Sequence, residues 1–178
     1  MTFIESGIKF EFKIEAFDYD NKNKIDGKFA SFYPKISQCS SAIDFIAKDS
    51  KNIYFVEVKD KRKIPSDRAD WNEMFKELCK NTIDTFGVIY LVNDDEIQKI
   101  MDSDKFEEFK SIIDNIDILD KKFILFIAGD LEKDELTLIN EILLKKLKKS
   151  LTLFSIDVIV ETLNNYNINI YKVTNATP

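Results

Sequence analysis

The sequence predicts an α/β fold in which a mixed central β-sheet is flanked by helices. Signals for antiparallel strands come first: residues 8–17 alternate apolar and charged side chains, and residues 41–47 and 53–59 form a candidate β-hairpin. From residue 65 onwards, helical patterns and apolar strand patterns alternate along the chain. Antiparallel strands followed by such alternation are typical of a mixed sheet with helices packed on it. The length suits one domain, so we expect a single domain over residues 1–178.

Two strands are predicted before the hairpin. Because residues 8–17 alternate with period two, we expect a half-buried strand there. Its inward-facing residues are Ile8, Phe10, Phe12 and Ile14. Residues 18–26 are mostly polar and lead to Gly27, which predicts a loop. Residues 28–33 form a candidate second strand, which ends before Pro34.

A helix and a buried strand are predicted after the hairpin. Pro65 and Ser66 are typical of a helix start, with Ser66 as the N-cap. The residues at helical spacing that would pack on the sheet are Trp71, Met74, Phe75, Leu78 and Thr82. Residues 87–92 are continuously apolar, which is typical of a strand buried on both faces. Asn93 and Glu96 then predict a capping box, and an acidic helix is expected over about 104–115.

The C-terminal third continues the alternation. Residues 123–128 are apolar and predict another buried strand, which ends in Gly129 and Asp130. A long helix is expected over about 133–148. The apolar residues on one face of this helix are Leu136, Ile139, Leu143 and Leu147. We expect a further helix over 155–165 and a last strand over 168–173.

The composition limits the chemistry that this chain can perform. It contains no histidine, which excludes imidazole bases and histidine metal ligands and leaves carboxylates, lysine, hydroxyls and a hard cation. Cys39 and Cys79 lie in no metal-ligand spacing, so we expect free thiols. No signal-peptide pattern is apparent, and no apolar run approaches the ~20 residues of a membrane-spanning helix. We therefore expect a cytoplasmic protein without a membrane partner.

The candidate hairpin brings charged residues together. If its strands fold back symmetrically about Ser50 and Lys51, then Asp44 lies opposite Glu57, Ile46 opposite Phe55, and Ala42 opposite Lys59. One face would be almost wholly apolar, with Ile43, Phe45, Ala47, Tyr54, Val56 and Val58. The other face would carry Asp44, Glu57 and Lys59, and directly opposed Cβ atoms lie only ~5 Å apart. Because two carboxylates at that distance repel, the pattern predicts a divalent-metal site beside a lysine.

At these residues the chain resembles the PD-(D/E)xK nuclease superfamily, whose core presents an acid on one strand and an acid-x-Lys tripeptide on the next. Asp44 matches the first acid, and Glu57, Val58 and Lys59 match the tripeptide. The resemblance covers roughly residues 40–95 and implies a restriction-endonuclease-like core with an α/β C-terminal extension. The sequence departs from the pattern at Ile43, which replaces the proline of the motif, and shows no N-terminal helix with a further acid.

The resemblance implies a nuclease that hydrolyses phosphodiester bonds of DNA, or alternatively of RNA. Asp44, Glu57 and the Val58 carbonyl would hold Mg²⁺ or Mn²⁺, which prefer oxygen ligands. Lys59 would orient the attacking water or stabilise developing negative charge. The basic residues that follow, Lys61, Arg62 and Lys63, would contact flanking phosphates.

The charge of the chain is unevenly distributed. The net charge is −6, and residues 93–117 alone hold nine acids against three lysines, which accounts for all of it. We expect this acidic segment to face solvent or a basic protein partner rather than DNA. The basic residues over 145–149 are expected to close a helix, where cations are favourable. A homodimer is compatible with the sequence.

The sequence leaves three other interpretations open. The charged face of the hairpin could be a solvated surface with a Glu–Lys network. A nuclease-like module could serve protein interaction without catalysis. An α/β domain could bind a phosphate or nucleotide through Asp94, Asp95 and Asp130 at the carboxyl ends of strands, although no glycine-rich phosphate loop is present.

Overall fold

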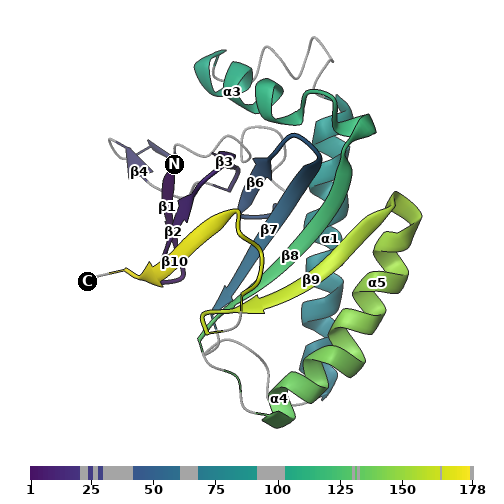
Figure 1. The fold of residues 1–178 in the computed structure, drawn as a ribbon. Coiled ribbons are helices and arrows are strands. Elements are labelled where there is room, and N and C mark those ends of the chain that lie inside the picture. Colours follow the sequence, from purple (N-terminus) through teal and green to yellow (C-terminus); the bar gives the residue numbers. More distant parts are fainter. Residues whose placement is uncertain are drawn as a thin grey trace.

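The computed structural model contains two packed β-sheets and a layer of helices (Figure 1). It describes residues 1–20, 24–25, 28–29, 42–60, 68–91, 103–129, 131, 133–164 and 166–176. Within this part of the chain, no helix is long and apolar enough to cross a membrane.

The larger sheet has five strands in the order β3-β6-β7-β8-β9. These strands are β3 (Glu15–Asp18), β6 (Phe45–Lys48), β7 (Asn52–Asp60), β8 (Asp120–Ala128) and β9 (Ile156–Thr162). The pairs β3–β6 and β6–β7 are antiparallel, whereas β7–β8 and β8–β9 are parallel. The predicted mixed α/β class is therefore confirmed.

The smaller sheet has three antiparallel strands in the order β1-β2-β10. They are β1 (Thr2–Glu5), β2 (Ile8–Phe12) and β10 (Tyr171–Asn175), so the two ends of the described chain meet in one sheet. Two short strands, β4 (Lys24–Ile25) and β5 (Lys28–Phe29), pair separately.

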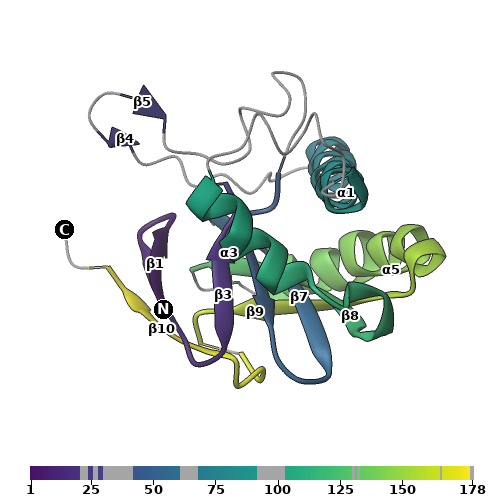
Figure 2. The same ribbon diagram turned by 90° about the horizontal axis from the view of Figure 1, so that it is seen from above.

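The helices are α1 (Arg68–Leu91), α3 (Ser103–Ile113), α4 (Lys133–Leu138) and α5 (Lys145–Leu151). Short turns η3 (Ile116–Ile118) and η5 (Thr152–Phe154) precede β8 and β9, and a π-helical stretch, η4 (Ile139–Leu144), joins α4 to α5. Seen from above, α1 and α5 lie on one side of the five-stranded sheet and the three-stranded sheet on the other (Figure 2).

The central strands β7 and β8 are buried on both faces, because alternate side chains enter two different cores. Ile53 and Phe55 pack in the core on the helix side, whereas Tyr54, Val56 and Val58 pack in the core against the three-stranded sheet. This arrangement explains the apolar run over 123–128, where every residue is buried and the predicted strand is confirmed.

The predicted strand over residues 87–92 is wrong for the residues that the structure describes. Residues 87–91 form the last turns of α1. Burial there follows the helical period: Thr85, Phe86 and Ile89 are buried, whereas Gly87 is exposed and Tyr90 is 65% exposed. A strand buried on both faces would cover all of these side chains.

The predicted helix over residues 155–165 is also wrong, because residues 156–162 form strand β9. This segment is rich in β-branched residues, which suit a pleated surface. It pairs in parallel with β8, and Ile156 and Val158 are buried on the helix side while Asp157 is exposed. A short apolar run is compatible with the period of a helix or that of a strand. Here the pairing with strand β8 selects the strand.

The other predicted elements differ from the observed ones mainly in the residues at which they begin and end. The predicted strand over 8–17 is divided at Lys13 and Ile14, so that β2 and β3 belong to different sheets and Ile14 is only partly buried. Strand β1 was not predicted. The acidic helix is present as α3, the long helix as α4-η4-α5, and the last strand begins at Tyr171. The expected capping residues Asn93 and Glu96 lie outside the described residues.

One buried carboxylate connects the two sheets at the C-terminal end of the chain. Glu161 in β9 is almost fully buried, and its Oε1 accepts hydrogen bonds from the backbone N–H groups of Asn167 and Ile168, both at 2.8 Å. Its Oε2 accepts a hydrogen bond from the Tyr171 hydroxyl in β10. The carboxylate thus fixes the path of the chain from β9 to β10.

We expect Glu161→Ala to lower the free energy of unfolding by about 3 kcal/mol, because it leaves the buried Tyr171 hydroxyl and two partly buried backbone N–H groups without their acceptor. Urea denaturation at neutral pH measures this. Asp157→Ala, an exposed carboxylate in the same strand, is the control and should change stability by less than about 0.5 kcal/mol. Similar losses in both variants would contradict the assigned role.

Candidate functional site

The β6–β7 hairpin places the predicted acids across from each other. The observed register pairs Phe45 with Val56 and Ile46 with Phe55, as predicted. Continued by one residue, this register sets Asp44 opposite Glu57. The paired residues end at Phe45, so neither the predicted pair of Asp44 with Glu57 nor that of Ala42 with Lys59 is part of the ladder itself.

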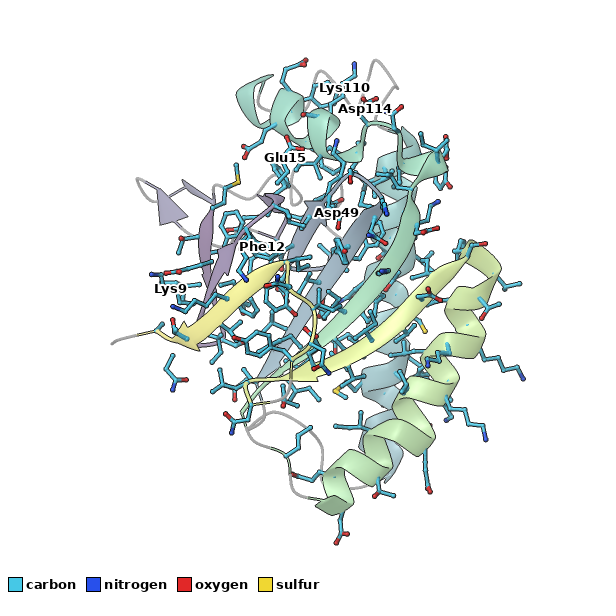
Figure 3. All side chains as sticks on the ribbon, in the orientation of Figure 1. Lys9, Phe12, Glu15, Asp49, Lys110 and Asp114 are labelled. Atoms are coloured by element: carbon cyan, nitrogen blue, oxygen red, sulfur yellow. The ribbon has the colours of Figure 1, made fainter. Side chains whose placement is uncertain are left out.

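The hairpin turn is held by Asp49, which Figure 3 labels at the turn between β6 and β7. Its Oδ1 accepts hydrogen bonds from the backbone N–H groups of Lys51 and Asn52, both at 2.8 Å, and its Oδ2 accepts one from the Tyr54 hydroxyl at 2.8 Å. A slip of one residue in a hairpin moves every side chain to the other face. Asp49 therefore helps to decide that Glu57 faces the helices.

Asp44 lies just before β6 and extends the ladder with its side chain. Its Oδ2 accepts a hydrogen bond from the Val58 N–H at 2.7 Å, and its own N–H donates to the Val56 carbonyl at 3.1 Å. Because the N–H and C=O of a strand residue point to the same neighbouring strand, the Val58 carbonyl also faces the Asp44 side. Ile43, predicted on the apolar face with Val58, packs instead in the helix-side core.

Glu57 is a buried carboxylate between the sheet and α1, with only 3% of the residue exposed. Its Oε1 lies 2.8 Å from Lys59 Nζ and accepts a hydrogen bond from Asn81 Nδ2 at 3.0 Å. Its Oε2 is buried and has no hydrogen-bond partner among the described residues. Burial raises the pKa of Glu57 more than the neighbouring Lys59 lowers it.

Lys59 is shared by two carboxylates. Its Nζ lies 2.8 Å from Glu57 Oε1 and 2.8 Å from Glu77 Oε1 of helix α1. Burial alone would lower the pKa of Lys59, but Glu57 and Glu77 reverse this effect and raise it above the ordinary value. Lys59 therefore carries its positive charge throughout the physiological pH range.

Sequence reasoning missed the contribution of α1. Glu77 and Asn81 contact Lys59 and Glu57, and Thr85 Oγ1 accepts a hydrogen bond from the Ile43 N–H at 3.3 Å, next to Asp44. The three residues are four apart and so lie on one helical stripe. This polar stripe beside the predicted apolar face was the signal available in the sequence.

The carboxylates do not form an evident cluster of metal ligands. Among the described residues, no group of three or more acidic or cysteine side chains is arranged to hold a metal ion. The expected repulsion between Asp44 and Glu57 is already relieved, since Asp44 accepts from Val58 and Glu57 is paired with Lys59. The remaining oxygen donors, in particular the unpartnered Glu57 Oε2, nevertheless fit a hard cation such as Mg²⁺.

Several predicted site residues lie outside the described part of the chain. These are Lys61, Arg62 and Lys63 of the basic segment and Asp94, Asp95 and Asp130 of the alternative phosphate site. Because residues 87–91 are helical, the strand that was to present Asp94 and Asp95 at its carboxyl end is absent from that position. The nucleotide-binding interpretation therefore loses the argument that Asp94 and Asp95 follow the carboxyl end of a strand.

The second basic segment is a helix end, as expected. Lys148 and Lys149 lie in the last turn of α5. Lys146 donates a hydrogen bond to Asn72 Oδ1 and lies 5.7 Å from the centre of the Phe75 ring, which attaches α5 to α1.

A separate hollow of about 220 Å³ lies beyond the site, between the end of α1 and the segment after α3. Its lining residues are Ile89, Tyr90, Lys110, Ile113, Asp114, Asn115, Ile116 and Asp117. None of the candidate site residues lines it, and Figure 3 places Lys110 and Asp114 near the helix α3 end of the molecule.

No family model, curated protein or solved structure matches this chain. The nuclease interpretation is therefore carried by Asp44, Glu57 and Lys59 and by their geometry.

We expect the hairpin turn to make stability depend on pH. Burial raises the pKa of Asp49, but the hydrogen bonds from Lys51, Tyr54 and Asn52 lower it by more, so that the pKa lies below its ordinary value of 3.8. A depressed folded-state pKa contributes stability that is present above the unfolded pKa and is lost as the pH falls through the folded pKa. Urea unfolding between pH 7 and pH 3 should therefore show a loss of stability that is smaller in Asp49→Asn. Asp117→Asn, which removes an exposed carboxylate outside the hairpin, controls for net charge, and an equal effect of both variants would contradict the prediction.

Proposed function

We propose that this protein is a metal-dependent nuclease that hydrolyses DNA phosphodiester bonds, with RNA as the alternative substrate. The observation that carries the proposal is a buried Glu57 with one unpartnered oxygen beside a charged Lys59. Asp44 is fastened to the same strand through the Val58 N–H. If the hairpin face were only a solvated surface, we would expect the Glu57 carboxylate to be exposed, because burial of a charge costs several kcal/mol.

In this proposal Asp44, Glu57 and the Val58 carbonyl hold the cation. When bound, a divalent cation supplies an activated water and polarises the phosphate. Lys59 donates to the phosphoryl oxygens or to the attacking water, and its ion pairs with Glu57 and Glu77 fix the position of its ammonium group. Such positioning and charge stabilisation account for most catalysis of phosphoryl transfer.

The acidic segment 93–117 disfavours contact with nucleic acid, because its carboxylates would repel phosphates. Helix α3 buries Phe106, Phe109 and Ile112 and exposes Glu107 to solvent. We assign nucleic-acid contact to Lys61, Arg62 and Lys63, which follow the site directly in the chain. The acidic segment 93–117 is then a surface for a protein partner, which could deliver the substrate.

A catalytically inactive interaction module is the second candidate. It is favoured by the double engagement of Lys59 and by the lack of a three-acid cluster in the described residues. An activity assay distinguishes the two functions.

The purified protein should cut DNA with Mg²⁺ or Mn²⁺, and EDTA should stop the reaction. We expect Glu57→Gln and Asp44→Asn each to lower the rate by roughly 10²-fold or more, since each removes a metal-binding charge. Glu57→Gln is preferable to Lys59→Ala, because loss of Lys59 leaves Glu57 buried without a counter-ion and would disturb folding as well as catalysis.

The matched control is Glu73→Gln, an exposed residue of α1 whose carboxylate pairs with Lys76. It should cut DNA like the parent. If Glu57→Gln also cuts like the parent across a metal titration, the nuclease assignment is wrong.

The basic segment should determine how strongly nucleic acid binds. Arg62→Ala and Lys63→Ala should each weaken DNA binding and reduce the slope of log K against log salt by about one, because each lost phosphate contact releases one counter-ion fewer. Fluorescence anisotropy over a salt series measures both quantities. Lys148→Ala and Lys149→Ala, in the last turn of α5, serve as controls, and equal effects at both segments would refute the assigned substrate path.

A further inference from the structure

Two buried oxygen atoms near the candidate site have no hydrogen-bond partner among the described residues: Glu57 Oε2 and Asn81 Oδ1. Both residues are almost fully buried, with exposures of 3% and 4%. The two side chains are joined by the 3.0 Å hydrogen bond from Asn81 Nδ2 to Glu57 Oε1. The two side chains that carry these unpartnered oxygens therefore lie next to each other between β7 and α1.

The chemistry of these atoms restricts what could occupy that volume. While Glu57 is ionised, its carboxylate oxygen and the amide oxygen of Asn81 both accept hydrogen bonds, so they cannot satisfy each other. The ammonium group of Lys59 is engaged by Glu57 Oε1 and Glu77 Oε1. A buried acceptor without a partner destabilises the folded state, so the missing occupant must be a cation or a hydrogen-bond donor.

The surrounding charge favours a cation over a water molecule. Among the described residues, one ammonium group, that of Lys59, is shared by the carboxylates of Glu57 and Glu77. These two carboxylates carry one more negative charge than Lys59 neutralises, and a neutral water does not balance that charge. Carboxylate and amide oxygens are ligands that hard divalent cations accept.

We propose that Asn81 completes the metal site, with its Oδ1 and Glu57 Oε2 as ligands of the same divalent cation. The inference rests on the proposed function in so far as Glu57 binds the metal there, and it adds a ligand from helix α1 that the hairpin motif does not contain. The two ends of the Asn81 amide have separate tasks. Nδ2 holds Glu57 Oε1 beside Lys59, and this leaves Oε2 and Oδ1 for the cation.

Metal binding in the absence of nucleic acid tests the inference. Isothermal titration calorimetry with Mn²⁺ alone should show binding to the parent that is lost in Glu57→Gln. Asn81→Leu removes the ligand oxygen at similar volume and should weaken Mn²⁺ binding by roughly 10- to 100-fold. Asn81→Asp keeps an oxygen and adds charge, so it should bind Mn²⁺ at least as tightly as the parent. Thr82→Val, a buried neighbour whose hydroxyl donates only within α1 to the Leu78 carbonyl, should bind like the parent.

The outcomes separate the inference from the proposed function. Equal Mn²⁺ affinity in the parent and Asn81→Leu, with binding lost in Glu57→Gln, overturns the role of Asn81 and leaves the metal site intact. No Mn²⁺ binding by the parent overturns both, and the two oxygens would then share a buried water or a proton.

A second measurement covers the case in which Asn81→Leu does not fold. Without metal, Asn81→Asp should melt at a lower temperature than the parent, because a second carboxylate then lies beside Glu57. Mn²⁺ should raise its melting temperature by more than it raises that of the parent, since a ligand that binds only the folded state stabilises it. Equal increments in the two proteins would count against Asn81 as a ligand.

Discussion

The arrangement of this protein depends on one constraint: a carboxylate, Glu57, lies inside the interface between the central sheet and helix α1. A buried charge is tolerated only with a counter-ion and hydrogen bonds around it. Lys59 supplies the counter-ion from the same strand, and Asn81 supplies a hydrogen bond from the helix. The docking of α1 is thereby tied to the charged residues of β7 as well as to apolar packing.

Glu57 faces helix α1 because β7 is buried on both faces and its side chains alternate between them. Side chains of even number on β7 pack against the three-stranded sheet, and those of odd number face the helices. Glu57 and Lys59 therefore follow Phe55 into the helix side of the molecule, at the carboxyl end of the strand. The hydrogen bonds of Asp49 maintain the hairpin register that directs Glu57 and Lys59 to the helix side. The turn and the site are therefore parts of one structural unit.

The same residues serve the fold and the proposed chemistry. Asp44 caps the Val58 N–H, so it is a structural acceptor before it is a ligand. Lys59 neutralises Glu57 and is held by Glu77, so its ammonium is ordered without a substrate. Natural proteins often break local rules of polar satisfaction at functional sites and compensate for this elsewhere. The oxygens of Glu57 and Asn81 that have no hydrogen-bond partner among the described residues are such a departure.

The mixed α/β class, the hairpin with its register and the strand over 123–128 could be predicted from the sequence, because turn chemistry and alternation are local properties of the chain. The sequence did not determine residues 87–91 or 156–162, whose short apolar runs fit a helix or a strand until a neighbouring element selects one. The sequence predicted that Asp44 and Glu57 lie close together, but it did not predict that Glu77 and Asn81 lie beside them. Which stripe of α1 meets Glu57 depends on how the helix packs, and only tertiary structure, through the burial of Leu78, Phe86 and Ile89 against the sheet, decided that.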